Sequence, residues 1–384
     1  MRALVVSDLH FGAWTGDDLL AHPLARQRLA PHLEGLDELV LLGDVFDLLF
    51  ARTPRAFTRA DAFFGLVAEK LAGRRVVWLA GNHDHHFVVR PLEQMVEAGL
   101  AGEPSPPAAF IERFLHHRLP GVECSIAYPT HRVGDVLLCH GHYLDAHVKG
   151  SLANRLLTRG LWSIAGGRPQ GGLEIADYEA SMIPLTELLY TVAQLPHGTN
   201  AQEGLLDQVR HLGRIFDALA APGKEARRVF ERIAARVRGD RGRPRAPEAQ
   251  PVSTDIARAV GPDEPVERSL HAYGDVVRSL GWDGEADQFV FSHTHQPLDG
   301  VIIPGMGARF WNTGCWIYEP TLASEQTFER YGRIAWPGTA VLVDTEEPAP
   351  RLLRLLEDLN PGPAGYDEAR RLGGMRAPGA LGAD

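Results

Sequence analysis

The chain has 384 residues, a length that predicts two or three domains, or one large domain that carries an insertion. Hydrophobic residues make up 45% and charged residues 23%, which excludes a mostly disordered chain or a fibre. The net charge of −10 means that the chain as a whole does not attract a nucleic-acid backbone. The charge does not exclude a local basic patch. Three cysteines are too few for a disulfide framework and weakly favour a reducing compartment. No apolar run reaches the roughly 18 residues of a membrane span.

Five short apolar runs, each followed by polar residues, predict strands that are buried on both faces. These runs are 3–6, 38–42, 75–80, 136–138 and 289–291. Helical patterns at 19–36 and 60–72 lie between the first three runs. Because strands alternate with helices, we expect an α/β fold, and polar residues at the carboxyl ends of such strands lie where ligands usually bind.

The middle of the chain has a different pattern. Apolar residues recur at helical spacing over 205–219 and 229–237, and 173–195 predicts a further helix that is broken at Pro184. We therefore expect a core with a helical insertion: core 1–144, insertion 145–284, core 285–359 and a loose tail 360–384. Within the insertion, 239–265 is rich in Pro, Arg and Gly and predicts a loop or linker.

Five motifs follow the five predicted strands. They are Asp8-x-His10, Gly43-Asp44-x-x-Asp47, Gly81-Asn82-His83-Asp84, His140-Gly141-His142 and His293-x-His295. Any one of them, taken alone, could equally be an ordinary turn. Together at one sheet edge, however, imidazoles and carboxylates would be costly to bury without a metal ion. The set therefore predicts a metal site.

In this order, the five motifs resemble those of the calcineurin-like metallophosphoesterase family, over about residues 1–145 and 285–345. The resemblance implies a four-layer αββα sandwich of two mixed sheets flanked by helices, here with an inserted helical cap. It also implies two divalent metal ions. Mixed oxygen and imidazole ligands favour Mn²⁺, with Fe or Zn²⁺ as alternatives.

The resemblance assigns roles residue by residue. Asp8, His10 and His295 would bind one metal ion, and Asn82, His140 and His293 the other, with Asp44 bridging both. His83 and Asp84 form the expected catalytic pair: His83 would stabilise the transition state or protonate the leaving oxygen, and Asp84, like Asp47, would orient the ligands. His142 and Asn312 are expected to support the ligands or to contact substrate.

The activity implied is phosphoester hydrolysis. Two metal ions about 3.5–4 Å apart can share and acidify a water, so that a metal-bridging hydroxide attacks phosphorus. We expect a small-molecule substrate with a phosphoester or pyrophosphate bond. A nuclease of the same fold is the alternative, against which the acidic net charge argues. A non-catalytic metal-binding scaffold ranks last, because every ligand position is filled. The phosphodiester, monoester or pyrophosphate preference and the oligomeric state are left open.

Within this family, the chain is most similar to the branch of UDP-2,3-diacylglucosamine pyrophosphatases, which also have a helical cap between the fourth and fifth motifs. His142 departs from that branch, which has Asp there. The cap carries basic residues that either meet a second phosphate or form a solvated face: Lys149, Arg155, Arg159 and Arg168. The role of the Arg-rich stretch 227–245 is left open. Because the apolar run before Asp8 is too short for a signal peptide, we expect a cytoplasmic protein.

Overall fold

The computed structural model describes residues 1–13, 18–85, 87–88, 110–147, 173–194, 265–318, 336–362 and 365–367. The chain divides into two compact units. The first comprises Met1–His142, Leu185–Gln194 and Gly281–Asp384, and the second comprises Tyr143–Pro184 and Leu195–Leu280. All the predicted site residues lie in the first unit.

The first sheet of this unit has six strands in the order β11-β10-β1-β2-β3-β4. They are β1 (Arg2–Val6), β2 (Glu38–Leu42), β3 (Arg75–Leu79), β4 (Glu123–Ile126), β10 (Thr339–Asp344) and β11 (Arg351–Arg354). Strands β1 to β4 run parallel, whereas β10 pairs antiparallel with both β1 and β11. Val5 pairs with Val40, and Val40 with Val77, so the carboxyl ends of β1, β2 and β3 share one edge.

The second sheet has five strands in the order β5-β6-β7-β9-β8. They are β5 (Thr130–Val133), β6 (Val136–Cys139), β7 (Gln288–Phe291), β8 (Leu298–Ile302) and β9 (Arg309–Asn312). Strands β6, β7 and β9 run parallel, and the two edge strands are antiparallel to their neighbours. The five strands predicted from sequence correspond to β1, β2, β3, β6 and β7, each with ends within one residue of the prediction.

Alternate residues of the central strands bury opposite faces of the first sheet. Ala3 and Val5 of β1 belong to an apolar cluster with Val290 and Trp311 of the second sheet, so the two sheets pack against each other. Residues on the far face of the second sheet, such as Phe289, are also fully buried. The predicted α/β fold with two mixed sheets is confirmed.

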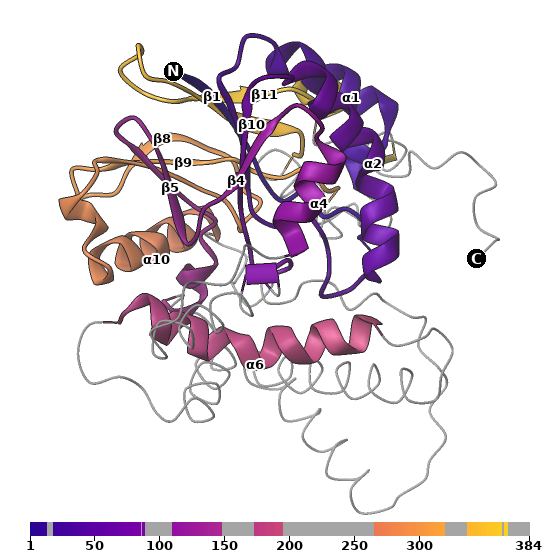
Figure 1. The fold of residues 1–384 in the computed structure, drawn as a ribbon. Coiled ribbons are helices and arrows are strands. Elements are labelled where there is room, and N and C mark those ends of the chain that lie inside the picture. The colour runs from indigo at the N-terminus through magenta and orange to yellow at the C-terminus, as the bar shows by residue number, and fades with distance from the viewer. Residues whose placement is uncertain are drawn as a thin grey trace, which may run out of the picture. The chain divides into compact units, whose positions relative to one another are not determined.

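The other face of the first sheet is covered by helices α1 (Pro23–Leu29), α2 (Thr53–Lys70) and α4 (Phe110–Arg118), which lie beside one another (Figure 1). The single helix predicted over 19–36 is wrong. Its place is taken by η1 (Leu19–Ala21), α1 and η2 (Ala30–Leu33), because Pro23 and Pro31 lack the N–H that a continuous helix needs. Helix α2 begins seven residues before the predicted start at Ala60, with Pro54 in its first turn, where proline is well tolerated.

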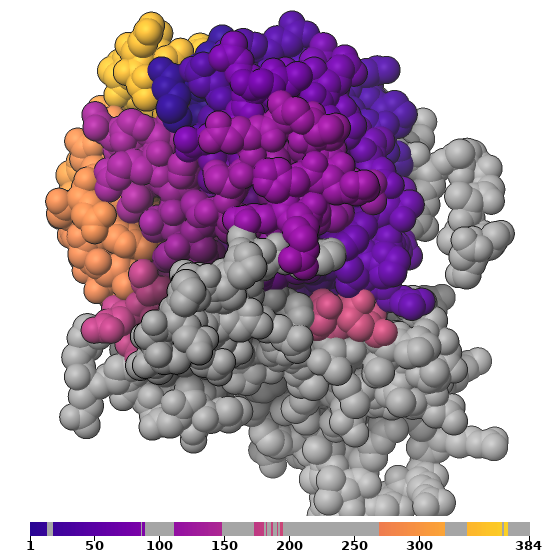
Figure 2. All heavy atoms as spheres, viewed as in Figure 1, coloured from indigo at the N-terminus to yellow at the C-terminus, as the bar shows by residue number. Residues whose placement is uncertain are grey.

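The first strand and the last strands of the first sheet meet at the surface. Figure 2 shows the first residues, in indigo, beside the yellow carboxyl-terminal strands. The amino group of Met1 donates a hydrogen bond to Thr345 Oγ1 at 2.7 Å, which joins β1 to the turn after β10. Among the described helices, none combines the length and the apolar character that crossing a bilayer requires.

The second unit contains most of η3 (His142–Ala146), the first half of α6 (Ile175–Gln194) and α10 (Pro265–Ser279). Helix α6 continues through Pro184, so the predicted break is wrong; a proline costs one backbone hydrogen bond but can kink a helix without ending it. Tyr178 of α6 stacks on Tyr143, with ring centroids 4.9 Å apart, and its hydroxyl lies 2.6 Å from His147 Nε2.

Some of the predicted features lie outside the described residues. These are the helical patterns at 205–219 and 229–237, the loop 239–265 apart from Pro265, the basic residues between 149 and 168, the Arg-rich stretch 227–245 and the tail beyond 367.

Candidate metal centre

The predicted site residues, apart from Asn312 at the end of β9, lie on five loops of the first unit, and each loop follows the carboxyl end of a parallel strand. Asp8 and His10 follow β1; Asp44 and Asp47 follow β2; Asn82, His83 and Asp84 follow β3; His140 and His142 follow β6; His293 and His295 follow β7. Two sheets that pack face to face thus direct their loops to one place, as expected for a ligand site in such folds.

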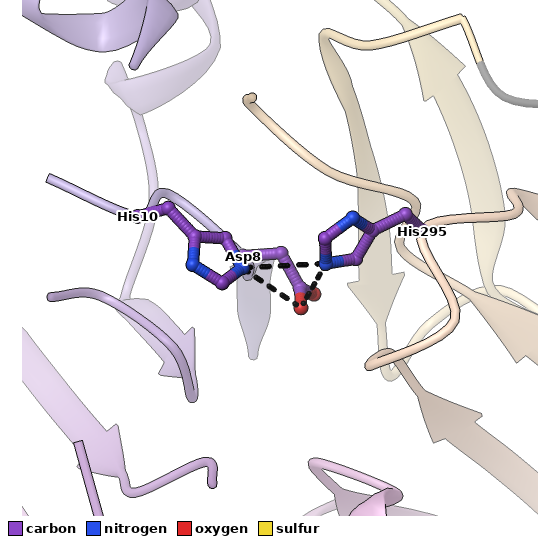
Figure 3. A group of neighbouring side chains, drawn as sticks. All are labelled: Asp8, His10 and His295. Carbon is purple, nitrogen blue, oxygen red and sulfur yellow. Dashed lines mark hydrogen bonds and ion pairs between the residues drawn. The ribbon is translucent and has the colours of Figure 1, made fainter. Parts of the chain in front are cut away.

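The first group of potential metal ligands is Asp8, His10 and His295 (Figure 3). His295 Nε2 lies 3.0 Å from Asp8 Oδ1 and 3.3 Å from His10 Nε2. His10 Nε2 lies 3.9 Å from the same carboxylate oxygen. All three ligand atoms lie within 4.8 Å of one another, as a single bound ion requires.

The second group is Asp44, His140 and His293. His140 Nε2 lies 3.3 Å from Asp44 Oδ2 and 3.3 Å from Asn82 Oδ1, so the predicted ligand Asn82 also borders this group. Asp44 Oδ2 lies 3.8 Å from His10 Nε2 of the first group. The Asp44 carboxylate is therefore placed between the two groups.

Backbone strain is concentrated at these residues. Five described residues other than glycine have positive φ: Asp8 (51°), His10 (46°), Asp44 (51°), His293 (67°) and His295 (57°). All five are predicted metal ligands. A positive φ costs a non-glycine residue roughly 1–3 kcal/mol, and such strain typically occurs at functional sites, where the surrounding structure enforces it.

Two glycines let the backbone approach the second group closely. A Cβ atom at Gly81 would lie 2.6 Å from His140 Nε2 and would also collide with Asp44 Oδ1. A Cβ atom at Gly43 would lie 2.6 Å from His140 Cγ. The glycines of the second and third motifs therefore leave room for the ligand side chains.

The ring of His140 is oriented by contacts on its far side. Its Nδ1 donates to the carbonyl oxygen of Leu42 at 2.8 Å and lies 2.9 Å from Ser292 Oγ. This arrangement turns Nε2 towards Asp44, which is how proteins usually fix a metal-binding histidine. Burial alone would lower the pKa of His140, but the Asp44 carboxylate raises it to about 9 in the metal-free protein.

The donor set fits divalent metal ions. Each group combines carboxylate oxygen with imidazole nitrogen, which suits Mn²⁺, Fe or Zn²⁺. Burial, aided by the nearby ring of His83, lowers the pKa of His10 to about 4, so its imidazole is neutral at pH 7 and has a lone pair for a metal. The pKa of Asp44 is well below its ordinary value: burial would raise it, but the charges of His140 and His83 and the hydrogen bond from His140 together outweigh that effect.

His83 is paired with a carboxylate. Its Nδ1 lies 2.7 Å from Asp47 Oδ1, and its backbone N–H donates to Asp44 Oδ1 at 2.7 Å. Burial would lower the pKa of His83, but the charges of Asp44 and Asp47 raise it above the usual value. Because Nδ1 faces Asp47, Nε2 is the ring atom that can carry a proton for another partner. His83 also forms a third close group with His10 and Asp44, so its position suits either a ligand or a proton donor.

Asp84 holds two of the loops together. Its carboxylate is fully buried and accepts the backbone N–H groups of Gly81, at 2.7 Å, and Val45, at 2.9 Å. Burial raises the pKa of Asp84 to about 7, and the charge of Asp44 adds to this. These contacts support the expected orienting role better than direct contact with a substrate.

His142 and Asn312 occupy different places in the site. The His142 ring is buried, with its centroid 5.4 Å from that of His140 and 6.4 Å from that of His293. Burial, followed by the charge of His140, lowers its pKa well below the ordinary value. Asn312 is also buried, and its amide bonds the Ser292 carbonyl, so it braces the loop that carries His293.

Two groups that hold the ligands are not among the predicted site residues. The hydroxyl of Ser292 contacts His140, and the hydroxyl of Ser7 contacts Asp8. Both residues stand next to a motif, but a serine beside a motif carries no signal of its own in a single sequence. The role of the two serines is visible only in the folded structure, where packing of the sheets brings the Ser292 hydroxyl to His140.

Comparison with known proteins agrees with this geometry. Residues 1–173 match the family model of calcineurin-like phosphoesterases. The first four motifs, from Asp8 to His142, lie inside this matched range, whereas His293 and His295 lie beyond it. The structure adds this last pair, because β7 lies beside β6 in the second sheet. The match supports the resemblance of the first four motifs to this family.

Two other comparisons add nothing to this assignment. None of the curated proteins compared with the chain is significantly similar to it. A crystal structure of a cold-active protein-tyrosine phosphatase from a psychrophilic Shewanella species aligns with 13% sequence identity and a TM-score of 0.27. That alignment covers 89% of this chain and 75% of the other, and at this TM-score it supports no statement about fold or substrate.

Proposed function

We propose that the first unit is a binuclear metal-dependent phosphoesterase that cleaves a phosphoester or pyrophosphate bond of a small-molecule substrate. The observation that carries this proposal is the position of Asp44 Oδ2, 3.8 Å from His10 in one ligand group and 3.3 Å from His140 in the other. A carboxylate in this position suits a bridge between two ions. Centres that hold two metal ions are common among enzymes that act on phosphates.

The proposed ligand set divides between the two ions. Asp8, His10 and His295 would hold one ion and Asn82, His140 and His293 the other, with Asp44 shared. Because oxygen and imidazole ligands are mixed and no cysteine takes part, we favour Mn²⁺ over Fe or Zn²⁺. When bound, the two ions would supply an acidified water as nucleophile and neutralise charge on the phosphoryl oxygens.

The protein's own residues would then assist the leaving group. As the bond from the water oxygen to phosphorus forms, the bond from phosphorus to the leaving oxygen breaks, and that oxygen needs a proton. His83 can donate it from Nε2, because the charges of Asp44 and Asp47 favour its protonated form. Asp47 would hold the ring in place through Nδ1, at 2.7 Å.

The substrate class is a further part of the proposal. The motif order resembles that of nucleotide-sugar pyrophosphatases such as those acting on UDP-2,3-diacylglucosamine, although His142 replaces the Asp of that branch. We propose that the inserted second unit helps to select the substrate, since binding energy far from phosphorus can be used to choose among phosphate compounds.

The test of function combines a substrate panel with two variants. Purified protein loaded with Mn²⁺ is assayed on p-nitrophenyl phosphate, bis-p-nitrophenyl phosphate, a nucleotide sugar and single-stranded DNA. We expect hydrolysis of at least one small-molecule substrate. Cleavage of DNA alone would favour the nuclease alternative, and no hydrolysis together with two bound metal ions would favour a scaffold.

The variants separate ligand from proton donor. Asp44→Ala should lose both ions and essentially all activity, because Asp44 is the shared ligand. His83→Ala should keep both ions, while its rate falls by roughly 10²–10⁴-fold. His116→Ala, at an exposed histidine of α4, is the matched control and should change neither. Loss of metal from His83→Ala would show that His83 is a ligand, and two ions with full turnover in Asp44→Ala would overturn the assignment.

A further inference from the structure

A buried chain of two hydroxyl groups ends on the carboxylate of Asp8. Ser7 and Thr313 are both fully buried. Ser7 Oγ lies 2.5 Å from Asp8 Oδ2, and Thr313 Oγ1 lies 2.6 Å from Ser7 Oγ. The two hydroxyls come from residues that are 306 positions apart in the chain: Ser7 directly follows β1, and Thr313 directly follows β9.

The direction of these hydrogen bonds follows from their chemistry. An ionised carboxylate can only accept, so the single proton of Ser7 points to Asp8. Ser7 Oγ then accepts from Thr313, whose hydroxyl proton has only a longer alternative, the Phe291 carbonyl at 3.4 Å. Ser7 likewise has a longer alternative acceptor in the Gly314 carbonyl at 3.4 Å. The short contacts therefore form a relay in which Thr313 donates to Ser7 and Ser7 donates to Asp8.

The relay is anchored to both sheets. The backbone N–H of Thr313 donates to the Phe291 carbonyl of β7 at 3.0 Å. The backbone carbonyl of Thr313 accepts the hydroxyl of Thr339, the first residue of β10, at 2.6 Å. Because β7 and β10 belong to different sheets, the position of the Thr313 hydroxyl depends on how the sheets pack. Rotation of the Asp8 side chain would break its hydrogen bond to Ser7 and so interrupt the relay.

The two oxygens of Asp8 consequently have different partners. Oδ2 accepts from Ser7 and is approached by the backbone N–H of His293 at 3.4 Å. Oδ1 instead faces His295 and His10, at 3.0 and 3.9 Å, in the first ligand group (Figure 3). Asp8 therefore presents one oxygen to that group while the other is held by the protein.

We propose that Ser7 and Thr313 are positioning residues that fix Asp8 as a one-oxygen metal ligand and thereby set the affinity of the Asp8–His10–His295 site. This inference rests on the proposed binuclear function. Hydrogen bonds to a ligating carboxylate typically change metal affinity by roughly 10- to 100-fold when they are removed. The relay acts on one site of the pair, so the two sites should respond differently.

The test measures metal binding rather than turnover. Metal-free wild-type protein, Thr313→Val and Ser7→Ala are titrated with Mn²⁺, and bound metal is measured at each step. Both variants should bind the first ion as the wild type does and the second roughly 10- to 100-fold more weakly. Thr313→Ser, which keeps the hydroxyl, should restore wild-type affinity. Should Thr313→Val fail to fold, Ser7→Ala carries the same test.

Two controls separate positioning from general destabilisation. Glu38→Gln weakens buried contacts to Arg75 and His131, neither of which belongs to a ligand group or to the relay, so it should lower the melting temperature but leave both affinities near wild type. With Co²⁺ bound, the visible spectrum should change in Thr313→Val and return in Thr313→Ser, because a freed Asp8 carboxylate can bind through two oxygens.

The outcomes distinguish the relay from the function on which it rests. Wild-type affinity at both sites in Thr313→Val and Ser7→Ala would overturn the relay alone, as would equal weakening in Glu38→Gln. A wild-type protein that binds no ion at the Asp8 site would overturn the proposed function together with the relay.

Discussion

Substitution of Gly81 by alanine is the smallest change that should disable the second ligand group. A Cβ atom at this position would lie 2.6 Å from His140 Nε2, whereas ordinary contact begins near 3.4 Å. The imidazole would have to move by about 0.8 Å, the difference between these two distances, and the Asp44 carboxylate, which lies closer still to the added atom, would have to move as well. Since a nitrogen ligand lies about 2.0–2.1 Å from a bound Zn²⁺ ion, a displacement of this size removes His140 from a useful position.

The expected result is a loss of metal affinity that exceeds the loss of stability. We expect Gly81→Ala to bind the ion of the Asp44–His140–His293 group at least about 100-fold more weakly. The added methyl group should also cost the metal-free protein roughly 1–3 kcal/mol, as overpacking of a core does. Metal content after dialysis and a Mn²⁺ titration measure the first effect, and thermal unfolding of the metal-free protein measures the second.

A matched glycine provides the control. Gly65 lies on α2, where an added methyl group would meet no neighbouring atom within 4 Å. Gly65→Ala should therefore bind metal normally and gain about 0.5–1 kcal/mol from better helix propensity. If Gly81→Ala binds two ions with wild-type affinity, then Asp44 and His140 are not ligands in the positions described.

The charged and hydrogen-bonded groups of the core lead to three further predictions. In the metal-free protein, protonated His140 should stabilise the fold fully below pH 6.5, and this stabilisation should be lost as the pH rises through about 9. Metal binding at pH 8 should release this proton. Calorimetry in buffers of different ionisation enthalpy measures the release, and finding none would contradict the prediction. Asp84→Asn keeps only one acceptor oxygen for the two backbone N–H groups. Metal titration should therefore show weaker binding, and melting should show that the free energy of unfolding falls by about 1–3 kcal/mol. An unchanged protein would exclude the bracing role of Asp84. Glu38→Gln weakens buried contacts of this side chain to Arg75 at 2.6 Å and His131 at 2.7 Å. Denaturant unfolding should show a loss of about 1–3 kcal/mol in the free energy of unfolding, with no change in metal content. Loss of metal would argue against this prediction.

The part of the fold that sequence predicts is the part that is apolar on both faces. Strands β1, β2, β3, β6 and β7 are nearly continuous apolar runs, and each is followed by a ligand motif. Strands β4, β8 and β11 are partly exposed, so their sequence patterns resemble those of loops and do not predict strands. Strand β10 is as apolar as the others but has no motif to draw attention to it.

The ligand types of the site could be predicted, but the way they are held could not. Residue type and order identify Asp8, Asp44 and His140. The positive φ of Asp8 and the close approach of Gly81 depend on backbone geometry, which no local pattern reveals. The relay from Thr313 to Ser7 joins residues that are 306 positions apart, so it exists only when the two sheets are packed.

The central claim is that this chain holds two metal ions joined by Asp44. Anomalous diffraction from crystals grown with Mn²⁺, recorded on both sides of the manganese absorption edge, tests it most directly. We predict two peaks about 3.5–4 Å apart, one bordered by Asp8, His10 and His295 and the other by Asn82, His140 and His293, with Asp44 between them. A single peak, or peaks away from Asp44, would contradict the account.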